Sequence, residues 1–215
     1  MTLTLYYHPL SSFCQKVMVA LYETGIPFTP RFIDFVKEED RDALLKVWPM
    51  GQFPVIRDEA KARTVPESSL IIEYLTLNFP EGASLLPRGG ETEFEIRYWD
   101  RLFDLHVNQQ MQIAMAERRK PEEERDAAAS KRAAGQIEAA YGLIDAHMAG
   151  REWAVDDGFS MADCAAAPAL NYAKLIVPFG KHGNVAAYHD RLTKRPSFAR
   201  ALKESEPWLQ YLATE

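Results

Sequence analysis

The chain has 215 residues, of which 47% are hydrophobic and 26% charged, a balance typical of a globular protein with a substantial core. Its 25 basic and 31 acidic residues give a net charge of −6, which argues against non-specific binding of nucleic acid. Two cysteines, Cys14 and Cys164, provide no disulfide framework. No signal peptide opens the chain and no apolar stretch approaches the roughly 18 residues of a membrane span, so we expect a cytoplasmic protein.

The first eighty residues predict a compact unit of alternating strands and helices. Apolar residues at every second position from 3 to 7 predict a half-buried strand, and residues 15–23 follow with helical spacing. Further strands are expected at 28–34 and 53–57, helices at 38–47 and from 70 to about 78, and a charged turn with a short strand over 58–66. The pattern therefore predicts a mixed α/β unit.

The remainder of the chain changes character. Five proline and glycine residues predict a linker at 80–91. The helical patterns after it cover 92–118, 122–149, 162–176, 184–194 and 197–202. Ser160 and Asp163 have the spacing of a capping box, with Phe159 placed for a hydrophobic staple. We predict an α/β domain at 1–79, a linker at 80–91 and an all-helical domain at 92–215.

The turn between the first strand and the first helix reads Ser11-Ser12-Phe13-Cys14. Free N–H groups and the dipole of a helix N-terminus favour negative charge, so these hydroxyls lie where a thiolate would be stabilised. A thioredoxin-like redox protein would carry cysteine at both ends of such a turn, and Ser11 at the first position argues against thiol–disulfide exchange. Simple N-capping is the alternative role of the hydroxyls. We expect both cysteines to be packed in the core.

A second segment, Gln52-Phe53-Pro54, lies at the start of a predicted strand. A proline in this position is often cis, and the cis bond exposes the N–H and C=O groups of the preceding residue. Phe53 would then pair its backbone with a peptide-like ligand. The alternative is that Pro54 only protects an edge strand.

A third segment, Glu67-Ser68, precedes the helix predicted at 70–77. A carboxylate and a hydroxyl at a helix N-terminus can bind the ammonium and carboxylate groups of an amino-acid-like ligand. Ordinary helix-start chemistry explains the same residues equally well.

Taken together and in this order, the three segments resemble the serine-type members of the cytosolic glutathione transferase superfamily. The third extends to Glu-Ser-Ser-x-Ile-Ile-x-Tyr-Leu at 67–75, and the resemblance runs on through the linker and the capping box. It implies a thioredoxin-like glutathione-binding domain at 1–79 and a helical domain that lines the site of a second, electrophilic substrate. It also implies glutathione as co-substrate, a homodimer and a role in detoxification.

The resemblance assigns roles to the residues of the first turn. Ser11 would donate a hydrogen bond to the glutathione sulfur, with the adjacent Ser12 as the other candidate. The stabilised thiolate would then attack a hydrophobic electrophile.

The resemblance also assigns residues to the other parts of glutathione. Phe53, followed by a cis Pro54, would hold the cysteinyl backbone. Glu67 and Ser68 would bind the γ-glutamyl end. Gln52 would lie at the glycyl side with a basic residue from 37–46.

Some features depart from the family pattern or favour other functions. Trp48-Pro49 stands where asparagine often precedes the proline, and Phe13 replaces a cysteine of the zeta-class isomerases. A glutathione-dependent isomerase and a catalytically silent glutathione-binding or interaction module remain the alternatives. The five histidines lack metal-ligand spacing, so no metal is expected.

The long helix predicted at 92–118 carries an aromatic and methionine-rich stretch. It comprises Tyr98, Trp99, Phe103 and Met111. The resemblance places this helix along the second-substrate cleft, whereas core packing and dimer contact are the simpler expectations for each residue alone.

Overall fold

The computed structural model describes residues 3–155 and 158–211 of the chain. Its first part is a sheet with three helices, and the elements follow one another in the predicted order. They are β1 (Leu3–Tyr7), α1 (Ser12–Thr24), β2 (Thr29–Phe32), α2 (Glu38–Val47), β3 (Val55–Asp58), β4 (Arg63–Pro66) and α3 (Ser68–Asn78). The α/β prediction for this part is confirmed.

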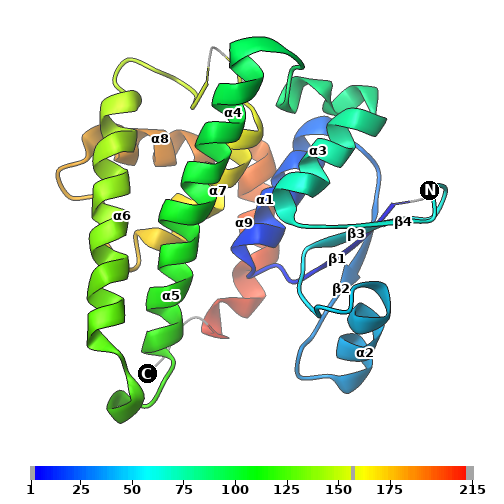
Figure 1. Cartoon of the computed structure of the whole chain (residues 1–215), viewed down its shortest axis with the longest axis horizontal. Coiled ribbons are helices and arrows are strands. Elements are labelled where there is room, and N and C mark those ends of the chain that lie inside the picture. Colours follow the sequence, from blue (N-terminus) through cyan, green and yellow to red (C-terminus); the bar gives the residue numbers. More distant parts are fainter. Residues whose placement is uncertain (1–2, 156–157, 212–215) are drawn as a thin grey trace.

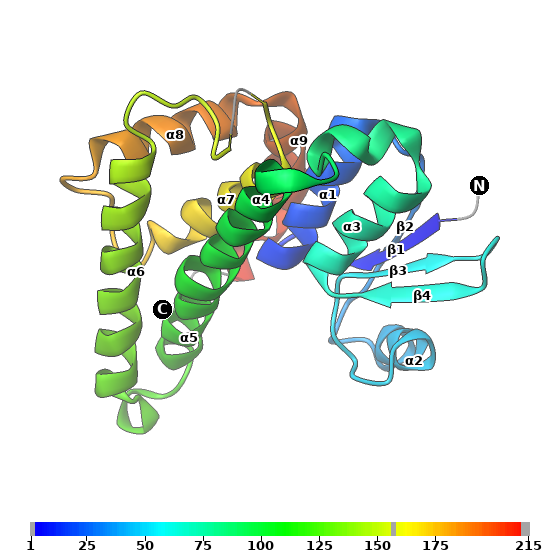
Figure 2. The ribbon, with the colours of Figure 1, turned by 45° about the horizontal axis from the view of Figure 1, so that its top comes forward.

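The sheet has the strand order β2-β1-β3-β4, with β1 and β2 parallel and the other pairs antiparallel. Helices α1 and α3 cover one face and α2 the other (Figure 2). A small cluster of Ile33, Leu44 and Val55 lies on the α2 side, whereas the main core continues into the helical part. The strand predicted from residue 53 begins at Val55, because Pro54 has no N–H group for the ladder.

The rest of the chain is helical, as predicted. It contains α4 (Gly90–Leu102), a π-helical segment (Phe103–Asn108), α5 (Gln109–Arg118), α6 (Ala127–His147), α7 (Met161–Ala173), α8 (Gly183–Lys194), α9 (Pro196–Ser205) and 3-10 helices at Pro80–Leu85, Glu122–Glu124 and Glu206–Tyr211. α4 and α5 form one long rod that runs beside α6, with α7 behind them (Figure 1). Among the described residues, no helix combines the length and apolarity of a membrane span.

Several boundaries differ from those expected. Half of the segment 80–91, predicted as an irregular linker, is the 3-10 helix Pro80–Leu85. This helix packs so closely on α3 that a Cβ atom at Gly82 would lie 2.9 Å from the Leu75 carbonyl oxygen. α6 begins at Ala127 rather than residue 122, because the Asp126 side chain caps it by accepting the N–H of Ala129. The final 3-10 helix was not predicted.

The capping box predicted at the start of α7 is confirmed. Asp163 accepts the backbone N–H of Ser160 at 2.8 Å and that of Ala154 at 2.9 Å, and the Tyr188 hydroxyl donates to it at 2.5 Å. Burial raises the pKa of the Asp163 carboxyl against the lowering effect of these donors. The carboxylate thus connects α7 to α8 and to the segment that precedes α7.

A buried ionic cluster joins the sheet part to the helical part. Lys16 of α1 is 1% exposed, and its Nζ lies 2.5 Å from Asp100 Oδ1 and 2.8 Å from Asp104 Oδ2. Ser69 of α3 accepts from Lys16 Nζ at 2.8 Å and donates to Asp100 at 2.7 Å. Burial alone would lower the pKa of Lys16, but the charges of the two aspartates outweigh it and raise that pKa. The lysine therefore stays charged within the interface.

We predict that Lys16→Met lowers the free energy of unfolding by about 3–5 kcal/mol, because among the described residues it leaves buried Asp100 without a cation and buried Asp104 with Arg101 alone. Urea denaturation followed by circular dichroism measures the loss. Adding Asp100→Asn and Asp104→Asn to this variant should recover much of the stability. Lys203→Met, which removes an exposed lysine of α9, is the control and should change stability by less than about 0.5 kcal/mol. Equal effects of the two lysine substitutions would contradict the prediction.

Candidate functional site

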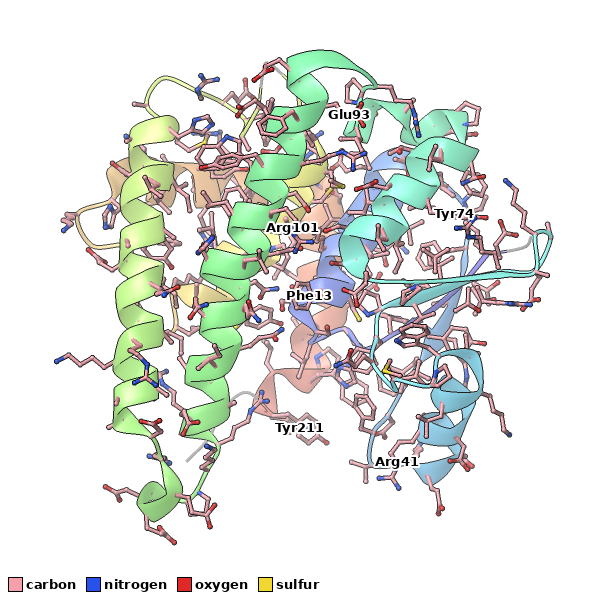
Figure 3. The ribbon with its side chains drawn as sticks, viewed as in Figure 1. Phe13, Arg41, Tyr74, Glu93, Arg101 and Tyr211 are labelled. Carbon is pink, nitrogen blue, oxygen red and sulfur yellow. The ribbon has the colours of Figure 1, made fainter. Side chains whose placement is uncertain are left out.

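A cavity of about 440 Å³ lies between the sheet part and the long rod of α4 and α5. The structure brings six of the seven predicted site residues into its lining. They are Ser11, Gln52, Phe53, Pro54, Glu67 and Ser68. The helical side contributes Arg101, Asp104 and Gln112 among others. Figure 3 places Phe13 of α1 and Arg101 of α4 between the two parts.

Ser11 is the N-cap of α1. Its Oγ accepts the N–H of Cys14 at 3.3 Å, and its own N–H donates to the carbonyl of His8 at 3.0 Å. Because the oxygen acts as acceptor in the cap, the hydroxyl proton is available to a ligand in the cavity. The capping role and the ligand-binding role are therefore compatible.

A second cavity of about 360 Å³ adjoins the first. The lining of both includes Ser11 and Gln112. Ser12, the remaining predicted residue, is 4% exposed and lines only the second cavity, where Gln112 Nε2 lies 3.5 Å from its Oγ. Of the two serines, only Ser11 lines both cavities.

The backbone beside the first cavity contains the expected cis bond and one conformation that was not predicted. The Phe53–Pro54 bond is cis. Glu67 has φ of +67°, a conformation that side-chain-bearing residues rarely adopt and that often marks a functional site. Its exposed carboxylate has no hydrogen bond or ion pair with the described residues, and Ser68 beside it begins α3. An anion in this place would meet the free N–H groups of the helix.

The basic side chain that lines the first cavity comes from α4, whereas the sequence predicted one from residues 37–46. No residue of α2 is among the described residues that line it, so the basic partner expected from 37–46 is not found there. Arg101 of α4 lines the cavity instead, and its Nη2 lies 3.1 Å from Asp104 Oδ2. Asp104 belongs to the π-helical segment, a form that often occurs at functional sites. The charges of residues 100, 101 and 104 are the sequence signal that could have indicated this side of the site.

The aromatic and methionine-rich stretch divides between core and surface. Trp99 and Phe103 are buried in the core, in agreement with the simpler expectation. Met111 lines the second cavity. Tyr98 is 49% exposed and lines a groove between α4 and α6 that shares Arg101 and Leu105 with the first cavity.

The last 3-10 helix supports the turn that carries Ser11. The Trp208 ring lies 5.2 Å from that of His8 and 4.8 Å from that of Phe32. Burial lowers the pKa of His8, which favours a neutral ring. His8 Nδ1 accepts the N–H of Leu10 at 3.1 Å. The C-terminal segment thus holds the start of the candidate site, and nothing in the sequence pattern pointed to it.

Within the described residues, no three histidine, cysteine, aspartate or glutamate side chains form a group that would hold a metal ion. The described side chains that line the first cavity beside the helix N-termini of α1 and α3 include hydroxyl, amide and charged groups.

Fold and site together define a thioredoxin-like domain joined to an all-helical domain, with a hydroxyl at the first helix N-terminus. Comparison with known families agrees: residues 5–83 match the glutathione S-transferase N-terminal domain and residues 106–196 the C-terminal domain. The chain belongs to the glutathione S-transferase family, as the sequence resemblance predicted.

Individual relatives are similar over nearly their full length. Glutathione S-transferase GstB of Escherichia coli is 26% identical over 203 residues, which cover 93% of this chain and 97% of the relative. A glutathione-bound glutathione S-transferase from Methylobacillus flagellatus is 26% identical with a TM-score of 0.85, covering 93% of this chain and 98% of the other. A glutathione S-transferase from Methylobacterium radiotolerans in complex with glutathione sulfonate is 28% identical with a TM-score of 0.81, covering 94% of each.

Both cysteines are fully buried, as expected, and we predict that neither reacts in the folded protein. Burial raises the pKa of Cys14 to about 12, although the Ser11 hydroxyl acts in the opposite direction, and the pKa of Cys164 is raised as well. Because the thiolate is the reactive form, iodoacetamide at about pH 8 should add nothing to the native chain. Mass spectrometry should find two adducts after unfolding in guanidinium chloride. Rapid alkylation of native Cys14 would contradict this prediction.

Proposed function

We propose that the protein is a glutathione transferase that joins the glutathione thiolate to a hydrophobic electrophile, with Ser11 stabilising the thiolate. One observation carries the proposal: Ser11 borders both adjoining cavities. A sulfur held at this hydroxyl would have the rest of glutathione on one side and a second substrate on the other.

The first cavity offers partners for each part of glutathione. The backbone of Phe53 would pair with the cysteinyl residue. The γ-glutamyl ammonium would meet the carboxylate of Glu67, and its carboxylate the hydroxyl of Ser68 and the N-terminus of α3. Gln52 would bind near the glycyl end, and Arg101 supplies a positive charge for one of the two carboxylates.

The proposed reaction begins with ionisation of the bound thiol, whose proton passes to solvent. The Ser11 hydroxyl and the N-terminus of α1 favour the thiolate, and each unit of lowered pKa corresponds to about 1.4 kcal/mol. The thiolate sulfur then attacks an electron-poor carbon of the second substrate. A C–S bond forms, and a leaving group such as chloride departs with the bonding electron pair. Ser11 keeps its own proton throughout.

Two alternative functions share the binding of glutathione and differ in the fate of its thiol. A silent glutathione-binding module would bind the peptide without ionising its thiol. A glutathione-dependent isomerase would add the thiolate reversibly to its substrate and release glutathione unchanged. Stable conjugation of an aryl halide separates the proposed transferase from both.

We predict that Ser11→Ala lowers kcat/KM for glutathione and 1-chloro-2,4-dinitrobenzene about tenfold near neutral pH. Loss of the donor destabilises the thiolate, so the pKa of the bound thiol should rise by about one unit and the pH–rate profile should move to higher pH. Thermal denaturation should show that the fold survives, because the loss of one N-cap costs only about 1 kcal/mol.

Ser12→Ala is the matched comparison for that variant. Ser12 is buried beside Gln112 and lines only the second cavity, so its substitution should leave the pH–rate profile in place. A larger loss in Ser12→Ala than in Ser11→Ala would transfer the role to Ser12. Unchanged rates in both variants would overturn the serine assignment.

We predict that Glu67→Gln weakens glutathione binding about tenfold, because the side chain keeps its shape and loses the charge that would face the ammonium group. Isothermal titration calorimetry measures the dissociation constant. Glu81→Gln, at another exposed position, is the charge-matched control and should bind as the parent does. Unchanged affinity in Glu67→Gln would show that Glu67 does not bind glutathione.

A further inference from the structure

The second cavity has a distinctive chemical composition. Its walls include the apolar side chains of Leu10, Met111 and Met115, while Gln112 and Tyr172 contribute polar groups. Methionine sulfur makes favourable contacts with aromatic rings. A volume of about 360 Å³ is near the lower end of the range for small-molecule sites. The space therefore suits a single substituted aromatic ring.

Arg119 is the charged residue of this lining. Its side chain is exposed and makes no ion pair or hydrogen bond with the described residues. The nearby Glu117 cannot neutralise it, because Lys120 lies 2.6 Å from one carboxylate oxygen and the N–H of Asp126 donates to the other at 2.8 Å. Among the residues that the structure describes, Arg119 thus presents an unpaired positive charge to a lining that is otherwise uncharged.

The neighbouring arginines have other partners. Arg118 donates to the carbonyl of Leu175 at 3.0 Å, and Arg125 donates to the carbonyls of Lys120 and Arg118 at 2.9 and 3.1 Å. Neither is among the residues that line the second cavity. Of these three arginines, Arg119 is therefore the one that lines the second cavity and has no partner among the described residues.

The spacing along the helix relates Arg119 to the reacting sulfur. Gln112, Met115 and Arg119 follow the spacing i, i+3 and i+7, which places them on one face. A rise of 1.5 Å per residue separates Gln112 from Arg119 by about 10 Å along the axis. Gln112 lies with Ser11 at the junction of the two cavities, and Arg119 lies farther along the second. The flexible arginine side chain can span the remaining distance to a group across an aromatic ring.

We propose that the second substrate is an aromatic electrophile with an anionic group, such as a carboxylate, remote from the reacting carbon, and that Arg119 binds this group. The inference rests on the proposed function and names its substrate class. The ring would pack against Met111 and Met115 while Ser11 holds the sulfur. The Tyr172 hydroxyl, which accepts from Gln15 at 3.1 Å, keeps its own proton to donate to an oxygen of the same substrate.

Two aryl chlorides that differ in one group test the proposal. 1-Chloro-2,4-dinitrobenzene is neutral, and 4-chloro-3-nitrobenzoate carries a carboxylate in place of the nitro group para to chlorine. In each, the sulfur bonds to the chlorine-bearing carbon and chloride leaves. For each chloride, kcat/KM is divided by the rate constant of its uncatalysed reaction with glutathione. The selectivity ratio is this quotient for the carboxylated chloride divided by the same quotient for the neutral one. We expect the parent to favour the carboxylate about fivefold by this ratio, and the preference to weaken at high salt.

Three variants show whether Arg119 causes the preference for the carboxylated chloride. Arg119→Ala should abolish the preference, and Arg119→Lys should retain most of it because the charge remains. Arg118→Ala removes the same charge one position away and should keep the preference of the parent. A parent without preference, or a preference that survives in Arg119→Ala, would overturn the proposal. An equal loss in Arg118→Ala would also overturn it, because it would show a general effect of surface charge.

Binding of the two glutathione conjugates separates this inference from the proposed function. If neither chloride is conjugated, the transferase assignment fails, yet calorimetry can still compare the two products as ligands. Tighter binding of the carboxylated conjugate to the parent, lost in Arg119→Ala, would support the anion site. Equal binding of both conjugates to the parent would overturn it.

Discussion

The arrangement of the two parts depends on one charged side chain that is removed from water. Lys16 belongs to α1, yet its ammonium group lies between Asp100 and Asp104 of the helical part, with Ser69 of α3 as a third partner. An isolated charge would be costly to bury, and here the surrounding carboxylates and hydroxyl offset much of that cost. Breaking the cluster would leave charges inside the interface, so the two parts are held in one relative position.

The cluster also fixes the position of the candidate site, because each of its members is close in sequence to a lining residue. Lys16 is one helical turn beyond Ser12, and Ser69 follows Ser68 directly. Asp104 itself lines the first cavity beside Arg101, and the same rod continues through Gln112 to Arg119. The proposed thiolate stabilisation and the proposed recognition of the second substrate would thus depend on the same interface.

The residues that were predictable from the sequence are those with a local signal. Ser11, Phe53-Pro54 and Glu67-Ser68 lie at helix or strand starts, where a short motif determines backbone and exposed groups together, and the structure places them in one cavity. Lys16, Arg101 and Arg119 were not identified, because a charged residue on a helix is usually solvated and only the packing of distant helices decides otherwise. The same holds for Trp208, whose contact with His8 joins opposite ends of the chain.

The central claim is that the junction at Ser11 holds glutathione as a thiolate, and ultraviolet difference spectroscopy of the bound peptide tests it most directly. Glutathione titrated into the protein from about pH 5 to 9 should show thiolate absorbance with a pKa at least one unit below that of the free thiol, near 8.5. Binding with an unshifted thiol pKa would contradict the account and leave a glutathione-binding protein without an activating site.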